Sequence, residues 1–248
     1  MIVLKNKSEI TLMREAGRIS AQALICGGEA VRPGVSTRHI DKIIHDYIRS
    51  QGATPSFLGY GGFPATACIS INDQVIHGIP GSRVIEEGDI VSIDVGACYK
   101  GYNGDNAATF AAGQISQEAQ NLMDVTKASL YKGIEAALSG ARIGDIGFAV
   151  QSLVEAAGYA VVRDFVGHGV GAKLHESPEV PNYGTKGRGV RLTSGMTIAI
   201  EPMVNVSGEA VKVLKDGWTT LTASGSLSAH FEHTILITDN GPIILTQA

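Results

Sequence analysis

The sequence predicts one mixed α/β domain of the α+β kind over residues 1–248, built from two related halves of approximately 1–112 and 113–248. Three observations predict it. The length of 248 residues fits one large domain with a substantial core. A helical pattern in the first half returns 106 residues later, and a β-rich run that ends in an acidic residue returns after 107. Because each half holds only part of a polar cluster, we expect a functional site where the halves meet.

The first two helices are predicted by apolar residues at helical spacing. One spans 8–30, with Ser8 as its expected N-cap. The other begins at Ser36 or Thr37, either of which can cap it, and ends at Gly52, which is placed to terminate a helix.

The second half predicts two further helices, over about 116–137 and 145–157, and Gly158 ends the latter. This last helix repeats the second one at an offset of 106 residues. Helical periodicity alone would supply some of the matches, but five at one offset suggest a repeat. The pairs are Gly34 with Gly140, Ile40 with Ile146, Ile44 with Val150, Ile48 with Val154 and Gly52 with Gly158.

Two β-rich runs carry the same repeat. Residues 88–94 and 195–201 each consist of a glycine, an apolar stretch and a terminal acid. Strands paired with return strands predict a central sheet that is rich in antiparallel pairings. The halves also share a His-x-x-Pro upstream of each run, at 77–80 and 175–178, and a further acid downstream of each, Asp105 and Glu232.

A hairpin is predicted to bring two carboxylates together. Residues 90–97 alternate between apolar and polar, and a turn centred on 99–100 would place Asp94 directly opposite Asp105. Their Cβ atoms would then be roughly 5 Å apart. Like charges at that spacing need compensation, which a divalent cation can supply. Two exposed acids screened by water are an equally good interpretation of this pair alone.

Three further polar residues, His168, Glu201 and Glu232, lie in apolar or glycine-rich surroundings. A lone core histidine is usually structural, but a buried, unpaired glutamate is costly. With Asp94 and Asp105 the set offers four carboxylates and one imidazole, whose negative charge two divalent ions would neutralise. Two-metal sites hold their ions about 3.5–4 Å apart. The lack of thiolate ligands favours Mn, Fe(II) or Co over a structural zinc.

Composition argues against several classes of partner. The net charge is −4 and the densest basic stretch, 186–191, is short, so we expect no specific nucleic-acid partner. No apolar run is long enough to span a membrane, and no signal peptide is evident. The three cysteines, Cys26, Cys68 and Cys98, have no pairing pattern, which indicates reduced thiols and a cytoplasmic setting.

Six motifs, in order and at matching spacing over nearly the whole chain, resemble type I methionine aminopeptidases in their short form without an N-terminal zinc-binding extension. The set is highly specific, although no single motif is. The motifs are His-Gly-Ile-Pro at 77–80, Ser-Ile-Asp-Val-Gly at 92–96, Gly-Asp at 104–105 with Ala-Ala-Thr-Phe at 107–110, Gly-His-Gly-Val-Gly at 167–171, Ile-Glu-Pro at 200–202 and Phe-Glu-His-Thr at 231–234.

The resemblance implies the pita-bread fold of creatinase- and aminopeptidase-like enzymes, in which halves related by a pseudo-two-fold axis surround the sheet. It implies removal of the initiator methionine from nascent proteins, with two divalent ions (Co, Mn, Fe(II) or Zn) and a bridging water or hydroxide as nucleophile. It also implies a cytoplasmic monomer that contacts the ribosome transiently. The implied ligands are Asp94, Asp105 and Glu232 for one ion, and Asp105, His168, Glu201 and Glu232 for the other.

The resemblance also implies catalytic roles. Glu201 would move a proton, His175 would donate a hydrogen bond to the carbonyl oxygen, and His77 would act near the scissile amide. Both histidines would contact substrate. The resemblance also places five residues in a methionine pocket: Tyr60, Phe63, Cys68, Leu174 and Trp218. Ordinary core packing is the alternative for each, and for Tyr60 and Leu174 it is an equally good interpretation, whereas the loop position of Trp218 favours the pocket.

Four positions depart from the pattern of the family without removing a ligand, and they put the shape of the pocket in question: Phe57, Gly61, Asn103 and His230. A proline dipeptidase or aminopeptidase P is the nearest alternative, but such enzymes usually carry an additional N-terminal domain. A non-catalytic peptide-binding or ribosome-associated relative should have lost metal ligands. A purely structural α/β domain leaves the acidic cluster unexplained.

Overall fold

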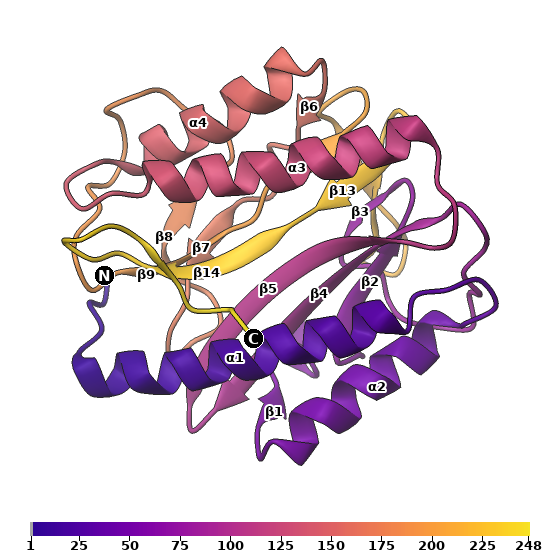
Figure 1. Ribbon diagram of the computed structural model, residues 1–248, viewed down its shortest axis with the longest axis horizontal. Coiled ribbons are helices and arrows are strands. Elements are labelled where there is room, and N and C mark those ends of the chain that lie inside the picture. The colour runs from indigo at the N-terminus through magenta and orange to yellow at the C-terminus, as the bar shows by residue number, and fades with distance from the viewer. Residues whose placement is uncertain (1) are drawn as a thin grey trace.

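The computed structural model describes residues 2–248, and its helices form two pairs on opposite sides of the strands (Figure 1). One pair comes from the start of the chain and the other from its middle. None of the helices within 2–248 combines the length and apolarity needed to cross a membrane. The helices are α1 (Lys7–Glu29), α2 (Thr37–Ser50), the short 3₁₀ helix η1 (Tyr60–Gly62), α3 (Gln117–Ala136) and α4 (Ile143–Ala156).

The strands between the helix pairs are short, apart from one long hairpin. They are β1 (Thr54–Pro55), β2 (Ala67–Ile71), β3 (Gln74–Ile76), β4 (Ile90–Tyr99), β5 (Tyr102–Ala111), β6 (Ala160–Val161), β7 (Gly167–Gly169), β8 (Glu176–Val180), β9 (Thr197–Ile200), β10 (Met203–Asn205), β11 (Val211–Val213), β12 (Thr220–Thr222), β13 (Ser228–His230), β14 (Glu232–Leu236) and β15 (Ile243–Ile244).

A nine-stranded sheet forms the centre of the molecule, in the order β1-β4-β5-β14-β9-β7-β8, with β2 beside β4 and β15 beside β14. Two three-stranded sheets, β13-β10-β6 and β11-β12-β3, accompany it. Every pairing within these sheets is antiparallel. The predicted mixed α/β architecture with an antiparallel-rich sheet is confirmed.

The four predicted helices are present, but the N-cap of α1 is Asn6 and not Ser8. Asn6 Oδ1 accepts hydrogen bonds from the backbone N–H of Ser8 at 3.0 Å and of Glu9 at 3.1 Å. The Glu9 carboxylate in turn accepts from the Asn6 N–H at 2.7 Å, which completes a capping box. The prediction of Ser8 was wrong because both residue types cap helices and the apolar pattern begins only at Ile10.

The hairpin of β4 and β5 has a different register from the predicted one. Its turn is Lys100–Gly101, both with positive φ (+48° and +85°), as two-residue hairpin turns require. Asp94 therefore pairs with Ala107 and not with Asp105. Asp105 lies two residues along β5 from Ala107, so the two acids are diagonal neighbours on the same face of the sheet.

Each helix pair covers a separate apolar core. Ile40 of α2 and Ile93 of β4 are fully buried in the first core. Ile146 of α4 and Ile198 of β9 are fully buried in the second. The pairing of β5 with β14 joins the two cores. Packing on both sides therefore holds these two strands in a fixed relation where the halves meet.

Matched positions in the two halves have similar backbone conformations. Glycines at these positions have positive φ, a backbone conformation that other residue types rarely adopt. This agreement supports the proposal that residues 1–248 form one domain of two related halves. The φ values are +90° for both Gly34 and Gly140, +69° and +84° for Gly52 and Gly158, and +92° and +93° for Gly88 and Gly195.

Candidate metal centre

Four acidic side chains come together on one face of the central sheet, at the junction of the halves. Asp94 on β4 and Glu232 on β14 both pair with Ala107 on the intervening strand β5. Asp105 lies on the same face of β5, and Glu201 directly follows β9, the neighbour of β14. The small side chain of Ala107 leaves space between Asp94 and Glu232. The structure thus brings together all four carboxylates that the sequence singled out.

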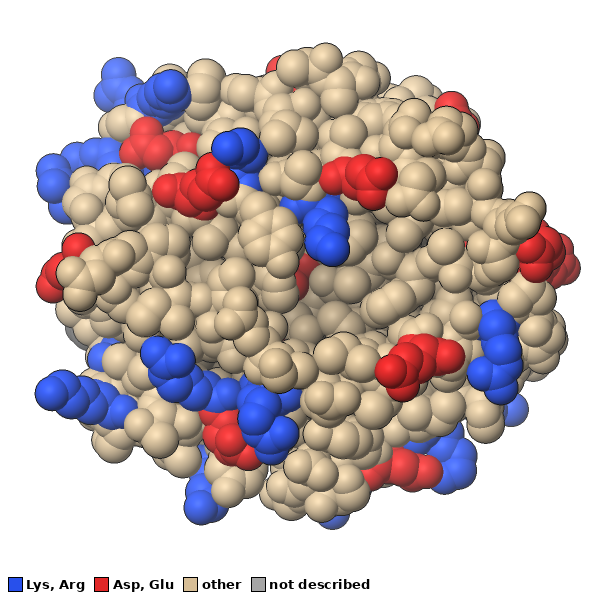
Figure 2. Space-filling view, in the orientation of Figure 1, with Lys and Arg blue, Asp and Glu red and all other residues tan. Residues whose placement is uncertain are grey.

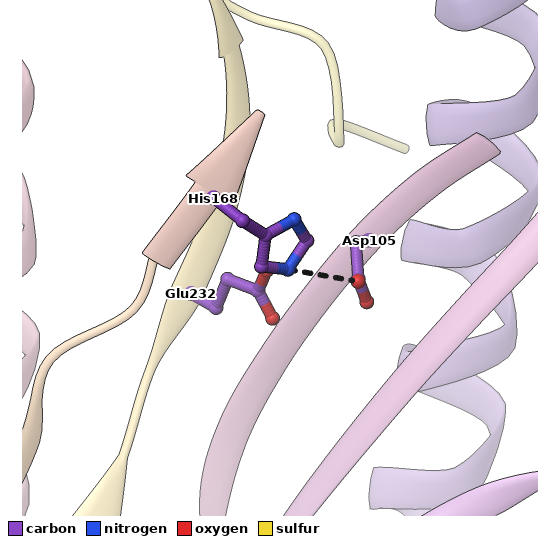
Figure 3. Close-up of side chains that lie close together, drawn as sticks. All are labelled: Asp105, His168 and Glu232. Carbon is purple, nitrogen blue, oxygen red and sulfur yellow. Dashed lines mark ion pairs between the residues drawn. The ribbon is translucent and has the colours of Figure 1, made fainter. Parts of the chain in front are cut away.

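His168 on β7 completes the cluster. Its Nε2 atom lies 3.8 Å from Asp105 Oδ2 and 3.6 Å from Glu201 Oε1, and Figure 3 shows its ring converging with Asp105 and Glu232. Single ligand atoms of Asp105, His168 and Glu232 all lie within 4.8 Å of one another. His168 Nδ1 is 2.9 Å from the Gly169 carbonyl oxygen, so Nδ1 carries the proton and Nε2 presents a lone pair to the carboxylates.

Burial makes this cluster costly without a cation. Asp94 Oδ1, Asp105 Oδ1 and Glu232 Oε1 are buried and have no hydrogen-bond partner among the described residues. Burial raises the pKa of Asp94 to about 7 and that of Glu201 to about 8. Burial raises the pKa values of Asp105 and Glu232 well above the ordinary range, and the charges of their acidic neighbours make the second-largest contribution to this increase.

This donor set fits divalent ions. Carboxylate oxygens and an imidazole nitrogen are the ligands that Mn, Fe, Co and catalytic Zn ions use in proteins. Burial lowers the pKa of His168 to about 3, so its imidazole is neutral and able to bind a metal at neutral pH. The orphaned carboxylate oxygens lie where such ions would satisfy them.

A cavity of about 870 Å³ opens beside the cluster and contains Asp94, Asp105, His168, Glu201 and Glu232 in its lining. The molecular surface is hollowed near the centre of the face in Figure 2, between mainly uncharged residues. The rest of the lining includes every residue predicted to contact substrate: His77, His175, Tyr60, Phe63, Cys68, Leu174 and Trp218.

Comparison with known proteins identifies the family. A family model described as metallopeptidase family M24 matches residues 11–239. The chain belongs to metallopeptidase family M24. The prediction of a metal-dependent peptidase is confirmed at this level.

Relatives within family M24 narrow the comparison. The chain is 55% identical to the methionine aminopeptidase of Clostridium perfringens over 246 residues, which cover 99% of each protein. It is 49% identical to methionine aminopeptidase 1 of Bacillus subtilis, and the match covers 100% of both. The structure of the methionine aminopeptidase of Thermotoga maritima matches with a TM-score of 0.99 at 46% identity, covering 100% of both chains. The resemblance stated from the six motifs is confirmed.

Other M24 enzymes share the fold over a larger protein. The prolidase of Pyrococcus horikoshii matches with a TM-score of 0.82 at 26% identity, and the match covers 100% of this chain and 64% of the prolidase. The predicted fold class is confirmed by these structures. Proline-specific enzymes of family M24 thus share this fold. The fold alone therefore does not distinguish a methionine substrate from a proline substrate, and the lining of the cavity must do so.

The two histidines predicted to contact substrate lie in different surroundings. His175 Nδ1 is 2.7 Å from the Tyr60 hydroxyl, and its ring is 4.1 Å, centroid to centroid, from that of His168. His77 packs edge-on against Phe165 and Trp218, and burial lowers its pKa to about 4. Burial also lowers the pKa of His175, so both rings are neutral at pH 7 and able to donate one hydrogen bond each.

Several lining residues were not predicted from the sequence. Phe57 was noted only as a departure, and Phe165 lies two residues before the motif at 167–171, so its position offered a signal. Lys5 and Tyr102 also line the cavity. They gave no signal, because a single lysine near a chain end and a tyrosine beside a turn are typical surface residues.

The raised carboxylate pKa values predict how the metal-free chain responds to pH. The folded-state values of about 7 for Asp94 and about 8 for Glu201 exceed their unfolded values of roughly 4. Stability from such groups is present at low pH and is lost as pH rises through the folded pKa. The buried histidines, whose folded pKa values are lowered, add stability as pH rises until the unfolded rings are also neutral, at about pH 7.5.

Between pH 7.5 and 8.5 we therefore expect the free energy of unfolding of the metal-free chain to fall by about 1 kcal/mol. Urea unfolding at both pH values in the presence of a chelator measures it. Excess Mn(II) should remove the decline, because a bound cation keeps the carboxylates ionised. A metal-free chain that gains stability over this range contradicts the electrostatic account of the cluster.

Proposed function

We propose that this chain is a methionine aminopeptidase that hydrolytically removes the N-terminal methionine of nascent proteins and peptides. One observation carries the proposal: a single cavity joins an apolar pocket to the buried cluster of four carboxylates and a histidine. The pocket accounts for an apolar side chain on the substrate, and the cluster accounts for hydrolysis of the adjacent amide. The full-length matches to methionine aminopeptidases support the same activity.

We propose that two divalent ions, drawn from Mn, Fe(II), Co or Zn, bind the cluster. Bound ions of this kind lower the pKa of a water molecule and polarise a carbonyl group. The proposed ligands are Asp94, Asp105 and Glu232 for one ion, and Asp105, His168, Glu201 and Glu232 for the other. Asp105 and Glu232 belong to both sets, in accord with their places on the adjoining strands β5 and β14.

The chain's own groups supply proton transfer and orientation. Glu201 directly follows β9 and lines the cavity, and we assign it to accept a proton and return it during the reaction. When the Tyr60 hydroxyl donates to His175 Nδ1, the proton of the neutral ring is on Nε2. Nε2 is then free to donate to the carbonyl oxygen of the scissile amide as negative charge develops. We assign His77 to the same amide from the apolar side of the cavity.

The apolar pocket selects methionine. Phe63, Cys68 and Leu174 are buried together, and Trp218 packs edge-on against Phe63 with ring centroids 5.1 Å apart. A flexible thioether side chain fills such an irregular apolar space well. Removal of a methionine side chain from water contributes roughly 1.5–3 kcal/mol to binding. Tyr60 is more exposed than the others and contacts His175 through its hydroxyl.

We further propose that the protein acts in the cytoplasm as a monomer and contacts the ribosome only transiently. New polypeptides carry the substrate methionine there. The three cysteines are free thiols in the structure, in accord with a reducing compartment. The net charge of −4 and the absence of a large basic surface patch in the sequence favour no specific nucleic-acid partner.

Peptide specificity tests the proposed function. We expect the metal-loaded chain to release methionine from Met-Ala-Ser and to leave N-acetyl-Met-Ala-Ser intact, because an aminopeptidase requires the free amine. Ala-Pro-Ser tests the proline-specific alternative. Release of alanine from Ala-Pro-Ser with Met-Ala-Ser untouched would overturn the proposal in favour of a prolidase-like enzyme. Product identification by mass spectrometry distinguishes these outcomes.

A further inference from the structure

A buried ion pair lies beside the cavity and has no part in the cluster of carboxylates. Lys5 Nζ is 2.6 Å from Glu176 Oε2, and their side chains are only 2% and 12% exposed. These residues are 171 positions apart in the chain. Lysine and glutamate side chains are rarely this deeply buried unless they are paired. Their pairing here joins two segments that line the cavity.

Lys5 is held in place by its own segment, which precedes α1. Its backbone N–H donates to the Gly195 carbonyl oxygen at 2.8 Å, and its Nζ also donates to the Val3 carbonyl oxygen at 3.1 Å. Gly195 lies in the turn that leads into β9 and so to Glu201. The lysine side chain is therefore fixed relative to the central sheet.

Glu176 uses both carboxylate oxygens to organise the loop that precedes it. Oε2 accepts from Lys5, and Oε1 accepts from the backbone N–H of Lys173 at 3.2 Å. The pair packs directly against Gly171, where a Cβ would collide with Glu176 Oε1 and Lys5 Cε. Residues 171–176 are thus closed into a compact loop, and Glu176 itself pairs with Gly169 of β7.

His175 lines the cavity beside this ion pair. It directly precedes Glu176, and the Tyr60 hydroxyl at Nδ1 is the only hydrogen-bond partner of its ring among the described residues. Tyr60 is 44% exposed, so this contact alone holds the ring weakly. The ring also packs edge-on against His168, with centroids 4.1 Å apart, and the backbone of the loop that the ion pair closes sets the position from which it extends.

We propose that Lys5 and Glu176 are positioning residues, which hold His175 at the distance its hydrogen bond to the scissile carbonyl requires. The inference rests on the proposed function of His175. A misplacement of a catalytic group by about 1 Å can lower a rate by up to about 100-fold. The Lys5–Glu176 ion pair can therefore affect the rate although neither residue is a proposed metal ligand. The same pair also fixes the segment with Val3 as part of the cavity wall.

The test compares Lys5→Met, Glu176→Gln and the double variant in the metal-loaded chain. Lys7→Met is the matched control, because Lys7 is exposed two residues away and forms no ion pair within residues 2–248. We expect each single variant to lower kcat for Met-Ala-Ser about tenfold, and Mn(II) affinity by calorimetry to stay within about twofold, since neither residue contacts the cluster. Lys7→Met should match the wild-type chain in both.

The double variant separates positioning from simple stabilisation. Each single variant leaves one buried charge unpaired and should lower the Tm, whereas the double variant leaves none and should recover it. Positioning predicts that kcat stays low in the double variant although Tm recovers. Recovery of kcat together with Tm would overturn the proposal.

A second readout does not depend on the reaction. The ¹⁵N resonances of the His175 ring in the metal-free chain should shift in Lys5→Met and in the double variant, while those of exposed His39 on α2 stay unchanged. An unchanged His175 signal in both variants overturns the positioning role. If the wild-type chain releases no methionine while the variants show the shift, the proposed function is refuted and the link between Lys5 and His175 still stands.

Discussion

Replacement of Asp105 by asparagine is expected to lower kcat/KM for Met-Ala-Ser by roughly 1000-fold, since a metal site contributes several kcal/mol and each 1.4 kcal/mol is a factor of ten. Asp105 is central to the cluster: it is 3% exposed, its Oδ1 has no partner among the described residues, and Oδ2 faces His168. Calorimetric titration with Mn(II) should show the loss of at least one bound ion. Peptide kinetics and this titration together measure the effect.

Stability distinguishes a ligand from a structural residue at this position. Asp105→Asn removes one of several crowded, buried acids, so the metal-free variant should unfold at the same or a higher temperature than the metal-free wild-type chain. Asp124→Asn, on the exposed side of α3, is the matched control and should change neither activity nor metal binding. Full activity of Asp105→Asn would show that the bridging assignment is wrong.

Replacement of His175 by alanine is the second large effect. We expect kcat to fall by roughly 100- to 1000-fold, the usual consequence of removing a hydrogen-bond donor to a developing oxyanion. Unlike Asp105→Asn, this variant should keep its metal stoichiometry, because His175 is not among the proposed ligands. Calorimetry and kinetics on the same sample therefore separate the two kinds of site residue.

The control for His175→Ala is His39→Ala, since His39 is an exposed histidine on α2 far along the chain from the cavity. Its activity should equal that of the wild-type chain. If His175→Ala reduces bound metal in proportion to activity, then His175 acts on the metal centre and not on the carbonyl oxygen.

Much of the fold follows from local signals in the sequence. Gly52 and Gly158 end helices where the predicted pattern stops, and Ser36 caps α2 as expected. The register of the β4–β5 hairpin was less accessible, because it depends on whether Tyr99–Lys100 or Lys100–Gly101 forms the turn. In the structure the turn is Lys100–Gly101, because glycine tolerates positive φ better than tyrosine does.

The site was predictable to the extent that its residues conflict with their surroundings. Glu232 lies in an apolar strand, and His168 lies between glycines. A polar residue in such surroundings indicates a functional role, so both could be predicted from the sequence. Lys5 and Glu176 could not be paired from sequence, because each is ordinary for a surface position and 171 residues separate them. Only the folded chain shows that both are buried.

Methionine release during stepwise metal addition tests the central claim most directly. Met-Ala-Ser is supplied to the metal-stripped chain while Mn(II), Fe(II), Co or Zn is added in separate series, and bound ions per chain are measured at each step. We predict no release before addition and a rise in release that levels off at two bound ions per chain. Full release by the stripped chain in excess chelator, or binding of all four metals with no release, would contradict a dinuclear methionine aminopeptidase.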